Sequence, residues 1–337
     1  MFLFNSRNIR FINICRRYYS TNRPIGVFGA PFNKGQPRPG VKYAPEALRN
    51  VNLIKNLSLM GHEVIDHGDL KFEAVPNDTA IYNIQTPRTI GKAAKQISDK
   101  VEEILRCGQT VVTLGGDHSM SVATIHGHAK VENDLAIIWI DAHPDINTPL
   151  TSASGNIHGM PLSFLTKELQ PYVPKLPGFE WLKPCISVKD IAFIGVRDID
   201  KAERYIIDKY NITTFTMRDI DKLGMECVLE RTIEAINPTL NKKIHMSFDI
   251  DSLDPAFAPS TGTPVPYGLS LREGMFLVEE IALTNKVTGI DLVEINPDLG
   301  SQRDQFTTIS AAAEVLYAFF GKRTKTQLPS DYVLPKP

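Results

Sequence analysis

Three segments of the sequence place acidic or histidine side chains directly after short apolar runs. The first is GGDHS at 115–119, which follows the apolar run 110–114. Its two glycines allow a sharp backbone turn, and Asp117 and Ser119 are suited to cap a helix that begins there. His118 is then delivered to the end of the preceding run. A single histidine in such a place is more often a hydrogen-bonded structural residue than a metal ligand, so this segment alone decides nothing.

The second segment brings three candidate metal ligands together. The apolar run 135–140 leads directly into Asp141, His143 and Asp145. If the strand continues, the two-residue period of β-structure places all three side chains on one face. Two carboxylates and an imidazole crowded at the end of an apolar strand are costly unless a cation neutralises them. The spacing therefore predicts a metal site.

The third segment repeats this arrangement with Asp249 and Asp251, which are expected to share a face of their strand. Together the segments supply six candidate ligands: His118, Asp141, His143, Asp145, Asp249 and Asp251. Four carboxylates balance two divalent cations, and an oxygen-rich set without a thiolate favours Mn²⁺ over a structural Zn²⁺. Two such ions about 3.5 Å apart can share a water and lower its pKa toward neutrality. We therefore expect two Mn²⁺ ions per chain and a hydrolytic reaction.

These ligands need a scaffold that brings the ends of several strands to one place. Eight apolar runs fit buried strands: 25–28, 63–66, 110–114, 135–140, 191–196, 213–216, 244–250 and 287–295. The clearest helical pattern between them begins at Thr86 and Pro87, expected as N-cap and first helical residue, and stops at Gly108. This alternation predicts a single three-layer α/β domain with an eight-stranded, mostly parallel sheet and helices on both faces. In such a sheet ligands bind just past the carboxyl ends of the strands, where the three segments lie.

The composition points to a small molecule as the partner. The chain has 37 Lys and Arg against 38 Asp and Glu, a formal net charge of -1. It therefore has no general attraction for nucleic acid or a membrane surface, and no apolar run is long enough to span a bilayer. The four cysteines form no CxxC pair, which argues against a zinc knuckle or a disulfide framework and favours a reducing compartment.

The first residues differ in composition from the remainder. Five arginines lie within the first 23 residues (Arg7, Arg10, Arg16, Arg17 and Arg23), and the first acidic residue is Glu46. Arginines mixed with apolar residues and no acids are typical of a mitochondrial transit peptide, and the sequence RYYS at 17–20 resembles a matrix-processing site. We expect residues 1–22 to direct the protein to the mitochondrial matrix and residues 23–337 to form the domain. The alternative is a disordered basic tail on a cytoplasmic protein.

Four motifs of the chain resemble signatures of the arginases, within the ureohydrolase family. They are GGDHS at 115–119, DAHPDIN at 141–147, SGNIHG at 154–159 and SFDIDSLDPAFAPSTGTPVPYG at 247–268. They occur in the same order as in the family, and the resemblance covers essentially residues 24–337. It implies an arginase/deacetylase-like fold, hydrolysis of L-arginine to L-ornithine and urea, and a homotrimer.

The resemblance also implies a role for each candidate ligand. One Mn²⁺ ion would be held by His118, Asp141, Asp145 and Asp249, and the other by Asp141, His143, Asp249 and Asp251. A hydroxide that bridges the two ions would attack the guanidinium carbon. Asp145 is expected to carry its proton to the departing amine, with His158 as the second candidate for proton transfer.

The resemblance further implies residues that recognise the substrate. Glu294 matches the position that faces the guanidinium group, a cation that suits a carboxylate; the alternative is a structural acid in a strand. Asn147, Ser154 and Asp200 match positions that recognise the α-carboxylate and α-amino groups, and Thr263 matches a further active-site position. Agmatine lacks the α-carboxylate, so these matches favour an arginase over an agmatinase.

Two alternatives and two departures from the family pattern remain. The alternatives are an agmatinase or other guanidino-substrate hydrolase, and a catalytically silent regulatory homologue that keeps only the fold. Pro144 stands where arginases commonly carry threonine, and Tyr267 where a glycine is usual. By the alternation argument Pro144 points away from the metals and affects the stiffness of its loop, and we expect Tyr267 to narrow the rim of the cleft.

Overall fold

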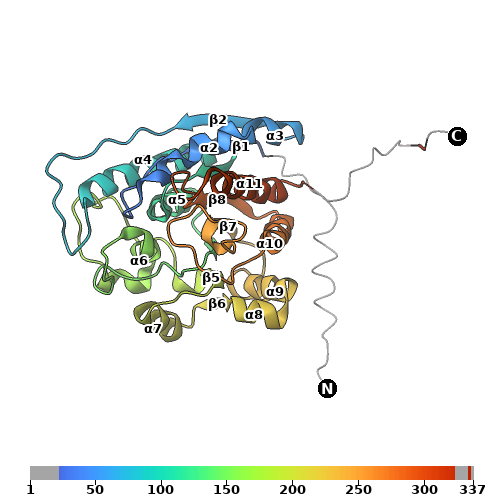
Figure 1. Ribbon diagram of the computed structural model, residues 1–337. Coiled ribbons are helices and arrows are strands. Elements are labelled where there is room, and N and C mark those ends of the chain that lie inside the picture. Colours follow the sequence, from blue (N-terminus) through green and yellow to red (C-terminus); the bar gives the residue numbers. More distant parts are fainter. Residues whose placement is uncertain (1–22, 323–332, 335–337) are drawn as a thin grey trace, which may run out of the picture.

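The computed structural model describes residues 23–322 and 333–334, so the expected transit segment 1–22 lies outside the described residues (Figure 1). Eight strands form one sheet in the order β2-β1-β3-β8-β7-β4-β5-β6. Their bounds are β1 (Ile25–Gly29), β2 (Val64–Asp69), β3 (Thr110–Leu114), β4 (Leu135–Ile140), β5 (Ile191–Val196), β6 (Thr213–Thr216), β7 (Lys243–Asp249) and β8 (Val287–Val293). All eight predicted strands are confirmed, and each pair of neighbours is parallel.

Helices connect the strands. The α-helices are α2 (Ala44–Asn50), α3 (Leu53–Leu59), α4 (Pro87–Arg106), α5 (Ser121–Ala129), α6 (Pro161–Leu165), α7 (Lys201–Tyr210), α8 (Met217–Leu223), α9 (Met225–Ile236), α10 (Leu271–Leu283) and α11 (Gln302–Phe319). Short 3-10 helices are η1 (Pro39–Tyr43), η2 (His118–Met120), η3 (Ile157–Gly159), η4 (Lys167–Tyr172), η5 (Val188–Asp190) and η6 (Ile250–Ser252). Within the part of the chain that the structure describes, none of these helices has the length and apolar character needed to cross a membrane.

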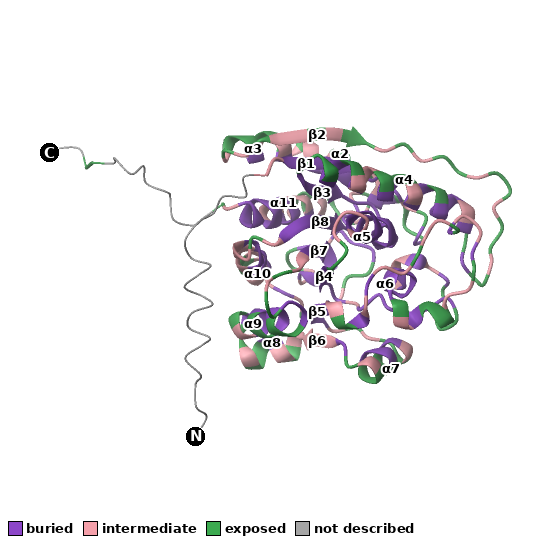
Figure 2. Ribbon diagram, turned by 180° about the vertical axis from the view of Figure 1, so that it is seen from behind, coloured by how far each residue is buried: buried purple, intermediate pink, exposed green. Residues whose placement is uncertain are grey.

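The sheet lies between two layers of helices, which confirms the predicted three-layer architecture (Figures 1 and 2). Helices α2, α3 and α8 to α11 share one apolar core with the sheet, and α4 to α7 pack on the other face. Neighbouring residues of β4 serve opposite faces: Ile138 packs in the first core and Trp139 in the second. Burying an apolar side chain of this size contributes about 1.5–3 kcal/mol to the stability of the fold. Because both faces of the central strands are covered, apolar side chains on both faces contribute in this way.

The predicted helix after Thr86 is present as α4, but its N-terminus is capped differently. Pro87 is the first helical residue, as expected, whereas Thr86 has a left-handed backbone (φ 45°) and makes no capping bond with its side chain. The carboxylate of Asp78 instead accepts hydrogen bonds from the N–H groups of Arg88 (3.2 Å) and Thr89 (2.7 Å). The cap thus comes from a loop folded back onto the helix, which local sequence patterns do not reveal.

The order of the strands explains why distant segments meet. Strands β3, β8, β7, β4 and β5 are consecutive neighbours in the sheet. Because all are parallel, their carboxyl ends lie at the same edge. Ile140 pairs with Phe248 and Asp249 pairs with Val293, so the residues that follow these strands emerge side by side. The edge where we expected the chemistry therefore gathers all three polar segments.

Candidate active site

The turn after β3 is built to bury His118. The Asp117 carboxylate accepts hydrogen bonds from the N–H groups of Ser119 (3.0 Å) and Gly35 (2.8 Å), so the expected cap by Asp117 is confirmed. Ser119 does not cap the helix but donates its hydroxyl to Asp117. At Gly116 a Cβ atom would lie 1.8 Å from the carbonyl oxygen of Phe32, so only glycine fits this turn. The result is a fully buried imidazole at the strand end.

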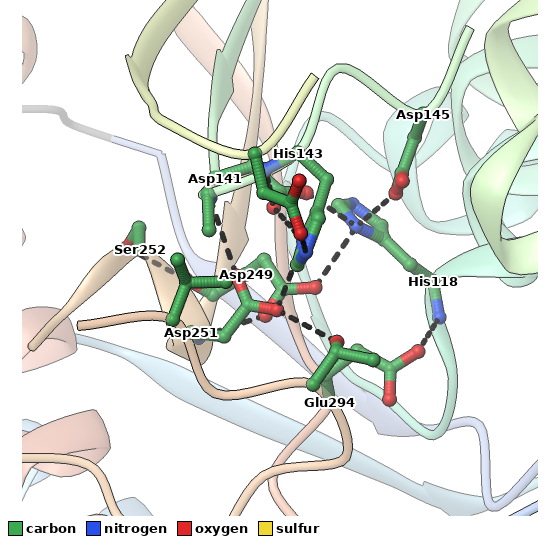
Figure 3. Close-up of polar contacts among 12 residues, drawn as sticks. His118, Asp141, His143, Asp145, Asp249, Asp251, Ser252 and Glu294 are labelled. Atoms are coloured by element: carbon green, nitrogen blue, oxygen red, sulfur yellow. Dashed lines mark hydrogen bonds and ion pairs between the residues drawn. The ribbon is translucent and has the colours of Figure 1, made fainter. Parts of the chain in front are cut away.

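The imidazole of His118 stands at the centre of a carboxylate cluster (Figure 3). Its Nδ1 atom lies 3.1 Å from one carboxylate oxygen of each of Asp141, Asp145 and Asp249. Its Nε2 atom lies 2.8 Å from the Ser247 hydroxyl. Nδ1 is buried and has no partner of hydrogen-bonding geometry among the described residues, and one N–H could not point at three acceptors. A single cation bound to all four atoms would satisfy them, so the donor set fits a metal ion.

A second group of donors adjoins the first. Nδ1 of His143 lies 3.3 Å from Asp141 and 3.2 Å from Asp251. One ligand atom from each of these three residues falls within 4.8 Å of the others, and the same holds for His118, Asp141 and Asp249. Asp141 is the member that the two groups share. The structure thus brings all six predicted ligands together as two adjoining candidate metal sites.

The convergence is confirmed, but the predicted reason for it is wrong. β4 ends at Ile140 and β7 at Asp249, so the alternation of a strand does not continue through either motif. Instead, the Asp141 carboxylate accepts a hydrogen bond from the N–H of His143 (2.7 Å), and the Asp249 carboxylate accepts one from the N–H of Asp251 (2.8 Å). Asp145 has a left-handed backbone (φ 50°). Tight turns, not pleated strands, aim these side chains inward.

The buried carboxylates of the cluster repel one another, so a bound cation would stabilise their charged forms. Burial, and then the charge of Asp141, raises the pKa of Asp145 to about 6. Burial, followed by repulsion from Asp251 and Asp141, raises the pKa of Asp249 well above its ordinary value. Burial lowers the pKa of His118, but its three carboxylate neighbours outweigh this and raise it well above the usual range. Without cations the cluster must hold protons that ordinary aspartates would release, so metal binding would displace them.

A cavity of about 200 Å³ opens from the candidate metal sites. Its lining residues are His143, Asp145, Asn147, His158, Gly159, Asp198, Asp200, Glu203, Asp249, Asp251 and Thr263. The lining thus includes candidate metal ligands (His143, Asp145, Asp249 and Asp251) and acidic side chains at the start of α7 (Asp200 and Glu203). Ser154 is not part of this lining: it is exposed, and its hydroxyl accepts a hydrogen bond from the N–H of Asn156 (3.2 Å). Its expected contact with the substrate rests on the resemblance alone.

The loop after β4 is joined to the start of α7 by Asn147 and Asp200. Asp200 caps α7 by accepting hydrogen bonds from the N–H groups of Ala202 (3.0 Å) and Glu203 (3.1 Å). Its other oxygen accepts a hydrogen bond from the Asn147 side-chain amide (2.6 Å). The structure therefore places both predicted residues in the cavity wall as a bonded pair. Thr263 lines the cavity too and donates to Asp251 (3.1 Å).

Two acidic residues of the cavity were missing from the sequence interpretation. Glu203 is 5% exposed and accepts a hydrogen bond from the N–H of Ile146 (3.1 Å). Burial, and then the charges of Asp145 and Asp200, raises the pKa of Glu203 to about 8. The capping-box spacing of Asp200 and Glu203 was a signal available in the sequence. Asp198 lies two residues past the end of β5. It could have been found from the rule that ligands bind just past the carboxyl ends of parallel strands.

Glu294 lies directly after β8 in a left-handed conformation (φ 61°) and is 2% exposed. Its Oε1 atom accepts a hydrogen bond from the N–H of His118 (2.8 Å) and lies 3.2 Å from Nδ1 of His158. Burial alone lowers the pKa of His158, but the pairing with Glu294 raises it to about 9. Glu294 thus links the turn that carries His118, shown in Figure 3, to the imidazole of His158 in the cavity wall.

The all-parallel three-layer fold and the cluster of carboxylates and imidazoles at its carboxyl edge define an α/β protein with two adjoining candidate metal sites. The arginase family model matches residues 23–321. Human arginase-1 is 46% identical over 316 residues, covering 93% of this chain and 98% of the human protein. The chain belongs to the arginase family, which confirms the resemblance and the expectation of an enzyme.

Solved structures agree with the fold. Arginase from Bacillus caldovelox has a TM-score of 0.81 and 34% identity, covering 90% of this chain and all of the bacterial one. Arginase from Entamoeba histolytica, solved in complex with L-ornithine, has a TM-score of 0.79 and 29% identity, covering 89% of this chain and 99% of the other. The eight-stranded parallel sheet with helices around it is therefore the fold of this family.

Proposed function

We propose that the protein is an arginase that hydrolyses L-arginine to L-ornithine and urea with two Mn²⁺ ions per chain. The observation that carries the proposal is the geometry around Asp141, which joins two adjoining donor groups whose other members include His143, Asp249 and Asp251 in the wall of a polar cavity. A cavity lined by both candidate metal ligands and an amide with further carboxylates suits a small substrate with more than one polar group.

The candidate ligands fit the proposed pair of ions. His118, Asp141, Asp145 and Asp249 would hold one ion, and Asp141, His143, Asp249 and Asp251 the other. Oxygen-rich coordination with two imidazoles suits Mn²⁺. When bound, the two ions would act as Lewis acids that lower the pKa of a water and so supply a nucleophile near neutral pH.

The remaining side chains would bind the substrate and move protons. The Asn147 amide, which lines the cavity, would recognise the α-carboxylate, and Asp200 and Glu203 beside it would bind the α-ammonium group. Beside the candidate metal sites, Asp145 would carry a proton toward the leaving amine. His158 is the second candidate for that transfer, since Glu294 keeps its ring protonated and fixed in the cavity wall.

The test is urea release by the purified, manganese-loaded protein from arginine, agmatine and related guanidines. We expect arginine to be strongly preferred and the activity to disappear when the metal is removed. Preference for agmatine or another guanidine would support the alternative hydrolase. Two bound Mn²⁺ ions without turnover of any guanidine would indicate the catalytically silent homologue.

Replacing Asn147 with aspartate should selectively reduce activity on arginine. The new carboxylate would repel the α-carboxylate of arginine, which agmatine lacks, whereas any disturbance of Asp200 affects both substrates equally. Since a hydrogen bond to a charged group contributes about 1.5–3 kcal/mol, kcat/KM for arginine should fall at least roughly tenfold more than for agmatine. Asn147→Ala, which adds no charge, is the control. Equal losses for both substrates would show that Asn147 does not recognise the carboxylate.

We also propose that residues 1–22 are a mitochondrial transit peptide, on the basis of their arginine-rich, acid-free composition. Deleting residues 1–19 should abolish import into isolated mitochondria and leave turnover of the purified enzyme unchanged, because the catalytic groups all lie beyond them. Import that persists without the segment would contradict the targeting role and favour the cytoplasmic alternative.

The resemblance to eukaryotic arginases also supports a homotrimer. The mass of the purified full chain in solution, measured by light scattering, tests this assembly directly. A monomeric protein with full activity would contradict it.

A further inference from the structure

Arg197 directly follows β5 and binds only backbone oxygens with its side chain among the described residues. Its guanidinium donates to the carbonyls of Asp251 (2.7 Å), Ser252 (3.2 Å), Leu253 (3.4 Å), Val265 (2.7 and 3.2 Å), Pro266 (3.2 Å) and Gly195 (3.2 Å). None of these partners is a carboxylate, which is unusual for a partly buried cation. The guanidinium, with its five N–H donors, therefore connects backbone carbonyls and does not form an ion pair among the described residues.

The guanidinium gathers the carbonyls at the end of η6. Residues 251–253 present three consecutive carbonyl oxygens where this short helix stops and has no further turn to use them. The first of them belongs to Asp251, whose carboxylate lies 3.2 Å from Nδ1 of His143. A fixed guanidinium on its backbone therefore sets the position from which Asp251 reaches the second donor group.

The backbone of Arg197 also contacts the segment that carries Asp141 and His143, the other two members of the second donor group. The backbone N–H of Arg197 donates to the carbonyl of Ala142 (2.8 Å), which stands between Asp141 and His143. The N–H of Ala142 in turn donates to the carboxylate of Asp251 (3.2 Å). Main chain and side chain of one residue thus connect the loop after β4 to the loop after β7.

A third loop is attached at the same point. Val265 and Pro266 follow Thr263, whose hydroxyl donates to Asp251 (3.1 Å). At Gly268 an added Cβ atom would lie 2.5 Å from Nη2 of Arg197, so the loop folds this closely over the guanidinium because it has a glycine there. The first donor group depends on other contacts: Ser247 and Glu294 hold His118.

We propose that Arg197 is a positioning residue that organises the donor group of Asp141, His143 and Asp251 and leaves the group around His118 largely independent. The inference rests on the proposed two-metal function. Lysine is a poor substitute, because a compact ammonium has three donors on one atom and cannot reach both the carbonyls of 251–253 and those of 265–266 as the guanidinium does. Residues that orient metal ligands typically change metal affinity about 10–100-fold when replaced.

The test compares full-length Arg197→Met and Arg197→Lys with the wild type and with Arg49→Met. Arg49 is a matched control, since it pairs with Asp66 (2.8 Å) and Asp69 (2.5 Å) on the edge strand β2. Each protein is titrated with Mn²⁺, and bound metal per chain is measured together with the electron paramagnetic resonance signal that separates coupled pairs from single ions. Melting temperatures of the metal-free proteins are recorded in parallel.

In Arg197→Met we expect one of the two ions to bind about 10–100-fold more weakly, with a single-ion signal where the wild type shows a coupled pair. Arg197→Lys should be weakened at the same site, and Arg49→Met should bind both ions as the wild type does. If Arg197→Met does not fold, the selective loss in Arg197→Lys carries the test. Unchanged affinity at both sites in a folded variant, or equal weakening at both, would overturn the proposal. A wild type that does not bind two ions would instead refute the proposed function.

Discussion

Replacing Asp141 with alanine should remove both manganese ions and lower kcat/KM for arginine by more than about a thousandfold. Asp141 is the member that the two donor groups share, so its loss leaves each group one ligand short. Removal of a single preorganised electrostatic contact already costs roughly 10²–10³-fold in kcat, and here the whole site is affected. Metal analysis after dialysis and urea release measure the two effects separately.

The fold should survive this substitution. The Asp141 carboxylate otherwise accepts hydrogen bonds from the Trp139 indole (3.0 Å) and the N–H of His143 (2.7 Å), and leaving such donors unpaired costs about 1–3 kcal/mol each. Asp141→Asn keeps an acceptor and serves as the milder variant. Asp208→Ala, which removes only an exposed pair with Arg204, is the control. Two tightly bound ions and normal turnover in Asp141→Ala would refute the shared-ligand assignment.

Asp249→Ala distinguishes two forms of the site. The resemblance implies that Asp249 bridges both ions, whereas the described distances group it with His118 and Asp141. If it bridges, Asp249→Ala should lose manganese and activity as Asp141→Ala does. Retention of one ion would mean that Asp141 alone joins the two sites.

The inner strands could be predicted because they are largely apolar and buried, as a parallel sheet covered on both faces requires, whereas the edge strands β2 and β6 are more polar and only partly buried. Val111 and Ile138, for example, are buried on opposite faces of the sheet. The capping of α4 could not be predicted, because Asp78 reaches it from a separate loop. Sequence patterns describe regular elements well and the loops that fold back onto them poorly.

The candidate site shows the same division. The six candidate ligands were identified because acids and histidines at the ends of apolar strands are chemically conspicuous. The geometry of these ligands could not be predicted, because nothing in the residue types around Asp145 indicates its left-handed backbone. Arg197 was missed for a related reason: its partners are backbone carbonyls, which every residue possesses. Contacts of this kind become visible only when the loops are placed in space.

Glu294→Gln should separate substrate binding from metal binding. The Glu294 carboxylate contacts the two donor groups at one point only among the described residues, where it accepts a hydrogen bond from the backbone N–H of His118. Glutamine keeps an oxygen that can accept this bond. Manganese should therefore remain at two ions per chain. If Glu294 faces the guanidinium, loss of its charge removes a contribution of about 1.5–3 kcal/mol, so kcat/KM for arginine should fall at least roughly tenfold.

The pH profile of the same variant isolates the effect on His158. In the wild type the pairing with Glu294 raises the pKa of His158 to about 9, against the effect of burial. A raised pKa means that the proton is lost at higher pH, so removing the carboxylate charge should move the ionisation of His158 to lower pH. The ionisation governed by the metal site should shift little, because the six candidate ligands are unchanged. Glu294→Asp, which keeps the charge on a shorter side chain, should preserve more of the wild-type profile.

Three measurements on Glu294→Gln thus decide between its possible roles: manganese content, kcat/KM for arginine, and the pH at which His158 loses its proton. Loss of manganese would place Glu294 in the support of the metal site, through the turn that carries His118. Normal turnover of arginine with an unshifted profile would make it a buried structural acid that only fixes that turn. A tenfold loss of kcat/KM for arginine with both ions retained is the result expected if the Glu294 carboxylate faces the guanidinium. In that case its charge acts on the substrate, and the metal ligands stay in place.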